Sequence, residues 1–323
     1  MKNTHALRRW LTAAAVALPI AAAAVYPEKA IEWVVPYPAG GGSDVVARIL
    51  SVPMGKTLGQ PIIINNKPGA ATNIGADYVA KSKPDGYVML TGDTATMAAN
   101  PALYTKLSYN VEKDFTPVGL MARFPMILVV NPDVPAKNLA EFMAWAKKQP
   151  NGVTYATPGA GSPHHLATEL FRELSGLTMV HVGYRGAAPA VQDVIGGQVP
   201  MMFVDTASGY QHIQSGRLVP IGVASPKRIA TFTTLPTLAE QGMKGFEAYA
   251  WQGLVVPAAT PPEALNALSK ALLAALETTE VKARFQTLGL ESIASTPAQM
   301  GEYAKSEREK WAKVIRASNI RLD

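Results

Sequence analysis

Residues 34–50 read VVPYPAGGGSDVVARIL, and this stretch decides which fold the chain adopts. The apolar run 31–35 predicts a buried strand, the glycines at 40–42 allow a tight turn, and Ser43 stands where a helix N-cap belongs. A strand, a glycine loop and a helix in this order leave the first amides of the helix without internal partners. These amides lie at the positive end of the helix dipole and can bind a small anion.

The residues after the glycines favour a carboxylate over a nucleotide as that anion. A nucleotide phosphate loop would continue as Gly-Lys-Ser or Gly-Lys-Thr, and no lysine follows here. A dinucleotide-binding loop would carry a third glycine three residues on, where Ala47 and Arg48 stand. A tight turn that binds nothing is the alternative, because many α/β folds turn in this way.

The first two dozen residues differ in kind from the rest of the chain. Lys2 and the pair Arg8-Arg9 precede an apolar, alanine-rich stretch that ends at Ala24. This pattern predicts a secretory signal peptide over residues 1–24, cleaved near Ala24, and hence a periplasmic protein. The paired arginines leave twin-arginine export as an alternative route.

The composition of the 323-residue chain allows two domains with full cores and excludes several classes of protein. Hydrophobic residues make up 48% and charged residues 17%, which argues against disorder. Cysteine is absent, so disulfides, a lipid attached to cysteine and thiolate metal sites are excluded. The formal net charge of +6 comes without a basic run, so we expect no nucleic-acid partner.

Short β-prone runs alternate with segments of helical periodicity through most of the chain. Strands are predicted at 31–36, 61–65, 87–91, 126–130, 153–156, 179–184, 201–205, 220–224 and 253–256. Helices are predicted at 43–57, 73–81, 139–148, 164–174, 189–195 and 207–214, and three more at 262–276, 279–288 and 297–318. Such alternation is typical of an α/β fold with largely parallel sheets.

A second glycine-rich loop follows another predicted strand and again opens a helix. Residues 157–162 read TPGAGS, and the helical segment PHHL comes directly after them. Two loops of this kind, one in each half of the chain, predict a cleft in which a ligand is held between two lobes.

Several segments carry motifs whose order and spacing are specific when taken together. They are residues 36–48, NKPGAATNIGA at 66–76, KPDGY at 83–87, KDFTPV at 113–118, 159–166, YRGAAPA at 184–190, 193–199 and WQGL at 251–254. Together they resemble the Bug family, the substrate-binding proteins of tripartite tricarboxylate transporters, close to the TctC type. The resemblance covers essentially all of the mature chain.

This resemblance implies an α/β periplasmic binding protein of the two-lobed type II, or Venus flytrap, kind with its ligand cleft between the lobes. One lobe would comprise residues 25–126 and 250–323, and the other residues 127–249. The ligand would be an organic acid, either a di- or tricarboxylate or an aromatic carboxylate, delivered to the membrane subunits of the transporter. We expect a monomer that needs no cofactor and no metal and is not an enzyme.

The candidate ligand-binding residues come from the two loops and from the ends of nearby strands. They are Tyr37, Ala39, Gly40, Gly41, Gly42, Ser43, Asp44, Thr91, Asp93, Thr94, Gly159, Ala160, Gly161, Ser162, His165, Tyr184, Arg185 and Asp205. Backbone amides at 39–43 and the second loop at 159–162 would meet a carboxylate, each contact contributing about 0.3–2 kcal/mol. For residues 91–94 an ordinary polar loop is the alternative.

Several candidates have a structural alternative. Asp44 would either select among ligands or stabilise the first helical turn, and we favour the second role. His165 would bond the ligand or pack against its own loop, and Arg185 would pair with a carboxylate or support its loop. Asp205 would face the cleft or cap the next helix. We expect His164 to lie on the surface.

Two other functions remain as alternatives. An exported serine hydrolase would use Ser162 and His165, but no Gly-x-Ser-x-Gly motif surrounds Ser162 and the spacing suits a triad poorly. Five histidines without a His-Glu-x-x-His motif leave no predicted metal site. A sensor-type binding protein that feeds a signalling system would have the same cleft and a different partner.

Overall fold

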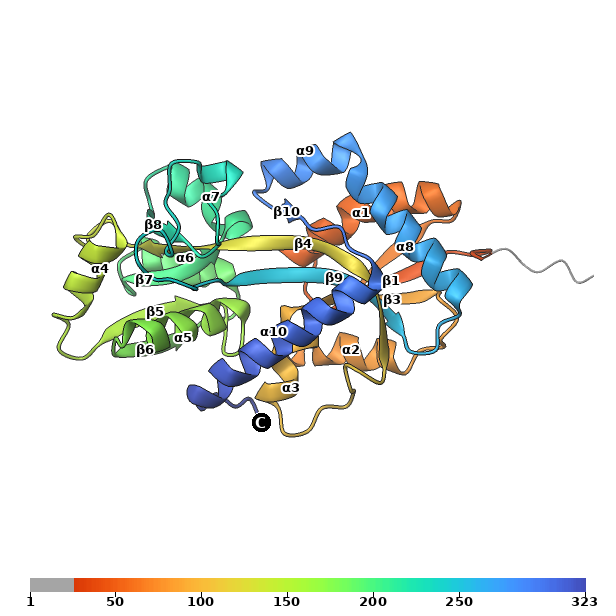
Figure 1. Cartoon of the computed structure of the whole chain (residues 1–323), viewed down its shortest axis with the longest axis horizontal. Coiled ribbons are helices and arrows are strands. Elements are labelled where there is room, and N and C mark those ends of the chain that lie inside the picture. The colour runs from red at the N-terminus through yellow and green to blue at the C-terminus, as the bar shows by residue number, and fades with distance from the viewer. Residues whose placement is uncertain (1–25) are drawn as a thin grey trace, which may run out of the picture.

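Two long strands connect the halves of the molecule (Figure 1). β4 (Phe115–Val130) and β9 (Tyr249–Pro257) pair antiparallel along its middle. The computed structural model describes residues 26–323, so the predicted signal peptide and its cleavage near Ala24 lie outside the described residues.

The half on the right of Figure 1 is built on three parallel strands. Its first elements are β1 (Ile31–Val35), α1 (Gly42–Leu58), β2 (Ile62–Asn66), η1 (Ala70–Thr72), α2 (Asn73–Ala80), β3 (Val88–Asp93), η2 (Thr94–Ala99) and α3 (Asn100–Leu103). β1 lies between β2 and β3, and β3 pairs antiparallel with β9. Parallel neighbours need a crossover connection, which α1 and α2 supply.

The half on the left repeats this arrangement. Its elements are α4 (Leu139–Ala146), β5 (Val153–Thr157), α5 (Pro163–Ser175), β6 (Met179–Gly183), α6 (Ala187–Ile195), β7 (Met201–Asp205), α7 (Thr206–Gln214), β8 (Val219–Val223) and η3 (Ala230–Phe232). β5 pairs in parallel with β6 and β7, whereas β7 and β8 pair antiparallel with β4.

β4 belongs to both halves. Its residues 115–125 pair with β9, and its last five residues pair with β7 and β8. The prediction of a strand at 126–130 alone was too short, because Pro117 and Pro125 interrupt the β pattern in the sequence. The strand accommodates Pro117 beside an irregularity in its pairing, where a proline without an N–H is tolerated.

Alternate residues of β4 pack into different cores, as the two-residue period of a strand requires. Ile127 and Val129 join a core with residues of α6 and α7, while Leu128 joins a second core with Phe171 of α5. That second core continues into the other half as far as Trp311. The two halves therefore share one buried layer.

The chain ends in helices that cover the right half. They are α8 (Pro262–Glu277), α9 (Thr279–Thr287) and α10 (Pro297–Ala317), with the short β10 (Glu291–Ser292) between the last two. α8 lies against α1, and α10 runs diagonally toward α5, where Arg172 donates to Ser318 Oγ at 3.2 Å (Figure 1). Within residues 26–323, none of the helices combines the length and apolar character that a membrane span requires.

Candidate functional site

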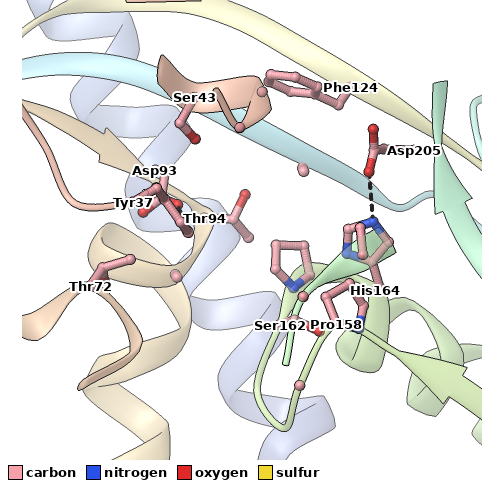
Figure 2. A pocket seen from close by; sticks show the side chains of 18 of the residues that line it. Tyr37, Ser43, Thr72, Asp93, Thr94, Phe124, Pro158, Ser162, His164 and Asp205 are labelled. Carbon is pink, nitrogen blue, oxygen red and sulfur yellow. Dashed lines mark hydrogen bonds and ion pairs between the residues drawn. The ribbon is translucent and has the colours of Figure 1, made fainter. Parts of the chain in front are cut away.

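A cavity of about 560 Å³ is lined by residues from both halves of the molecule. Its walls lie where β1, β3, β5 and β7 end, which is where open α/β sheets present ligand contacts. Tyr37, Asp93 and Thr94 line one side, and His164 and Asp205 line the other (Figure 2). The volume falls within the range of about 300–1,000 Å³ that is usual for small-molecule sites.

The first glycine loop presents the N-terminus of α1 to this cavity. Gly41 is the N-cap, so the predicted N-cap position of Ser43 is wrong. The Ser43 hydroxyl oxygen instead accepts a hydrogen bond from Gln252 Nε2 at 2.5 Å, and no side chain caps the helix. The first-turn amides therefore remain available to an anion.

Phe124 explains why the loop needs a glycine at the start of the helix. A Cβ on Gly42 would lie 3.1 Å from the Phe124 ring. Glycine at this position lets the ring approach the helix terminus, and both residues line the cavity.

The second glycine loop presents the N-terminus of α5. Gly159 and Gly161 have φ angles of 144° and 74°, which favour glycine. Ser162 is the N-cap, as predicted, with its Oγ accepting from the backbone N–H of His165 at 3.2 Å. All four residues from Gly159 to Ser162 line the cavity, opposite the N-terminus of α1 (Figure 2).

His165 lies behind this loop. Its Nδ1 accepts the Gly161 N–H at 3.0 Å, and its ring stacks on His181 with 4.0 Å between centroids. Burial, followed by the neighbouring His181, lowers the pKa of His165 to about 4. The neutral ring, with Nδ1 free to accept, is the form that this loop geometry requires.

Asp205 both lines the cavity and caps α7. Its carboxylate accepts from the Ser208 N–H at 2.8 Å and from His164 Nε2 at 3.0 Å. Burial acts to raise the pKa of Asp205, but hydrogen bonds from His164 and Ser208 outweigh it, so the pKa is lowered. His164 is only 8% exposed, so its predicted surface position is wrong: the ring packs inward to reach Asp205.

Tyr37, Asp93 and Thr94 form the opposite wall through local hydrogen bonds. The Tyr37 hydroxyl donates to Asp93, whose other oxygen accepts from the Thr96 N–H at 2.9 Å and caps η2. Burial raises the pKa of Asp93 above its ordinary value. Thr94 Oγ1 accepts from the backbone N–H of Trp251 at 2.9 Å, which joins this wall to β9.

Some candidates lie outside the cavity wall. They are Ala39, Gly40, Asp44, Thr91, His165, Tyr184 and Arg185. Asp44 accepts from the Gly40 N–H at 2.8 Å and pairs with Arg48 at 2.9 Å, so its favoured structural role agrees with its position. Thr91 accepts from Trp33 Nε1 at 2.9 Å inside the core. Asp44 and Thr91 therefore support the site from behind, whereas Ala39, Gly40 and Arg185 are exposed.

The structure also brings residues to the wall that were not among the candidates. They include Pro38, Thr72, Ala95, Phe124, Pro158, His164, Gly186, Ser208, Trp251 and Gln252. Trp251 and Gln252 lie in the motif WQGL, so the motif itself was a usable signal. Thr72 reaches the wall through a positive φ of 79°, which no sequence pattern indicates.

The wall has few charges. Among its described residues the acidic side chains are Asp93 and Asp205, with His164 beside the latter, and none is lysine or arginine. Within residues 26–323, no group of three or more His, Cys, Asp or Glu side chains could hold a metal ion. A bound anion would therefore meet helix termini and hydroxyl donors, and no lysine or arginine side chain of the described wall.

Comparison with known families identifies a receptor family. The family described as "Tripartite tricarboxylate transporter family receptor", TctC, matches residues 46–320. Protein BugT of Bordetella pertussis is 33% identical over 314 residues, which cover 97% of this chain and 96% of BugT.

Solved structures of similar proteins share the fold. Rpa4515 of R. palustris, solved with adipate, has a TM-score of 0.84 and 31% identity, covering 92% of this chain and 99% of Rpa4515. MatC of Rhodopseudomonas palustris, solved with bound malate, has a TM-score of 0.80 and 32% identity, covering 90% of this chain and 100% of MatC. The predicted two-lobed α/β fold is confirmed. This chain belongs to the TctC, or Bug, family, whose members are periplasmic solute-binding proteins and not enzymes.

Proposed function

We propose that this chain captures an organic carboxylate in the periplasm and delivers it to the membrane subunits of a tripartite tricarboxylate transporter. The observation that carries the proposal is the meeting of two helix N-termini, those of α1 and α5, at one cavity. Helix N-termini attract anions through free amides and the helix dipole. Adipate in Rpa4515 and malate in MatC support the same ligand class.

The carboxylate meets the backbone amides of the two glycine loops, around Gly42 and Gly161. A single contact at a helix terminus contributes only about 0.3–2 kcal/mol, so useful affinity needs several contacts. Ser43 and Ser162 add hydroxyl groups at the two loops. A ligand that touches both loops binds the closed arrangement more tightly than the open one, and this difference drives closure of the lobes.

Lobe 1 consists of residues 25–126 and 250–323, and lobe 2 of residues 127–249. The change of partner along β4, from β9 to β7 and β8 at Met126, supports the first boundary. At the second boundary the Ala248 N–H still bonds to Ala224 O at 2.9 Å, directly before β9 begins. The chain crosses between the lobes only along β4 and at the start of β9, which suits hinge closure of a monomeric receptor.

A thermal-shift screen of the mature protein tests the proposal. The panel contains mono-, di-, tri- and aromatic carboxylates, with neutral sugars as controls. A ligand at about 100 times its dissociation constant adds about 2.7 kcal/mol and raises the unfolding midpoint by several degrees. We expect carboxylates alone to shift the midpoint. A shift with sugars and none with any carboxylate would reject the proposed function.

A further inference from the structure

His164 and Asp205 form a buried pair on the lobe 2 side of the cavity (Figure 2). Both side chains line the cavity, and each residue is only 8% exposed. The pair comes from two elements, the first turn of α5 and the end of β7, so it has a fixed place in the fold. It lies across the cavity from Tyr37 and Asp93 (Figure 2).

The hydrogen bonds of this pair make Asp205 an acceptor. His164 Nε2 carries the hydrogen that is donated to Asp205 Oδ2. The other ring nitrogen, Nδ1, is buried and has no acceptor among the described residues. Asp205 is therefore a carboxylate acceptor, and the contacts with His164 and Ser208 lower its pKa although burial acts to raise it.

Asp205 also has unused capacity to accept a hydrogen bond. Its Oδ2 accepts from His164 and from the Ser208 hydroxyl, whereas Oδ1 accepts only from the Ser208 N–H among the described residues. A carboxylate oxygen can accept two hydrogen bonds. A hydrogen-bond donor of the ligand can therefore bind at Oδ1. A second ligand carboxylate would instead place a like charge beside Asp205, and the described wall has no lysine or arginine to offset the repulsion.

We propose that the ligand carries one carboxylate, held by the two helix N-termini, and at its other end a hydrogen-bond donor that Asp205 accepts. An ammonium group is the best donor because a charged donor makes the stronger hydrogen bond to a carboxylate, and a hydroxyl group is second. The ligand class is thus an amino- or hydroxycarboxylate, and dicarboxylate dianions are discriminated against. This inference rests on the proposed function, because it assumes that a carboxylate binds the glycine loops.

Matched ligands of equal length test this selectivity on the unaltered mature protein. Calorimetry compares succinate, 4-hydroxybutanoate and 4-aminobutanoate, and then adipate, 6-hydroxyhexanoate and 6-aminohexanoate. In the series that fits the cavity, we expect the amino acid to bind at least about tenfold more tightly than the dicarboxylate, with the hydroxy acid between them. A dicarboxylate that binds as tightly as its amino counterpart, or more tightly, would overturn the inference while leaving the proposed function intact. If none of the carboxylates binds, the proposed function fails with it.

The variant Asp205→Asn assigns the selectivity to this residue. Asparagine is as good a helix N-cap as aspartate, so α7 keeps its cap while the charge is lost. We expect the preference between amino acid and dicarboxylate to fall to within about threefold, which is under 1 kcal/mol. Asp77→Asn, which removes a charge that is paired with Lys81 outside the cavity wall, is the control and should keep the preference. An unchanged preference in a folded Asp205→Asn protein would refute the role of Asp205.

Discussion

Gly41 and Gly161 occupy similar places in the two glycine loops, but only Gly41 has room for a side chain. Gly41 has an ordinary φ of −75°, and a Cβ there would meet only Pro38 O at 3.5 Å. Gly161 has a φ of 74°, and a Cβ there would lie 2.7 Å from Leu103 and 2.8 Å from Leu322. A charge can thus be placed in the first loop without strain, but not in the second.

Gly41→Asp is therefore a clean test of the first loop. The added carboxylate lies beside the α1 terminus, where it competes with an anionic ligand and repels it. We expect ligand binding to fall below detection in calorimetry while the unfolding midpoint without ligand stays within a few degrees of the parent. Gly41→Ala controls for the added Cβ and should bind. Retained affinity in Gly41→Asp would count against a carboxylate site at this helix terminus.

Gly161→Ala is expected to lower stability, because it combines a strained backbone with two close contacts. Together these effects should reduce the free energy of unfolding by about 2–4 kcal/mol, measured by urea denaturation. Gly176→Ala is the matched control, since Gly176 also has a positive φ of 66° but a Cβ there meets nothing within 4 Å. Equal losses in the two variants would show that Leu103 and Leu322 do not restrict the second loop.

At the scale of elements, α5 couples the second loop to a histidine layer behind it. The helix begins with Ser162 as its N-cap and then buries His165 against His181 of β6. The Gly161 N–H needs an unprotonated Nδ1 on His165. Protonation of that ring would remove an acceptor from the turn that shapes the loop.

The lowered pKa of His165 predicts a loss of stability in acid. The pKa is about 4 in the folded protein against 6.5 for the free side chain, so folding favours the neutral ring. This contribution is complete above about pH 6.5 and is lost progressively as the pH falls toward 4, for a total of about 3 kcal/mol. His165→Asn keeps an acceptor for Gly161 and does not titrate. We expect its stability, measured by urea denaturation at several pH values, to fall less than that of the parent between pH 6.5 and 4; parallel curves would contradict this.

The elements were more predictable from the sequence than the site. Periodicity located β7 at its observed bounds, and the Ser162 cap followed from its position before a helical run. The inward position of His164 could not be predicted, because it depends on Asp205, which is 41 residues away in sequence. The same holds for the hydrogen bond from Gln252 to Ser43 at the cavity wall, which joins residues 209 apart in sequence. Local patterns predict caps and strands, whereas contacts between distant segments decide which side chains face the cavity.

At the scale of the whole molecule, the two lobes meet at contacts outside the cavity as well. Thr206, the first residue of α7, is fully buried and donates its hydroxyl to Gly289 O at 2.7 Å in the turn after α9. This hydrogen bond joins an element of lobe 2 to the C-terminal part of lobe 1. Its donor, Thr206, directly follows Asp205 in the sequence. We therefore expect this hydrogen bond to form when the lobes close over a ligand.

Thr206→Val tests that coupling. Valine keeps the shape of threonine but leaves Gly289 O without its hydroxyl donor. While the lobes stay together, this lost hydrogen bond destabilises the protein by about 1–3 kcal/mol. The cost is smaller in the open arrangement, where water reaches the carbonyl. We expect the variant to favour the open arrangement and to bind ligand up to about tenfold more weakly in calorimetry, although no cavity-wall residue changes. Thr260→Val removes a comparable 2.7 Å hydroxyl bond, to Pro257 O, within lobe 1, so it should lose stability without losing affinity. If both variants lose stability but neither loses affinity, the bond from Thr206 is made in open and closed forms alike, and the hinge must move elsewhere.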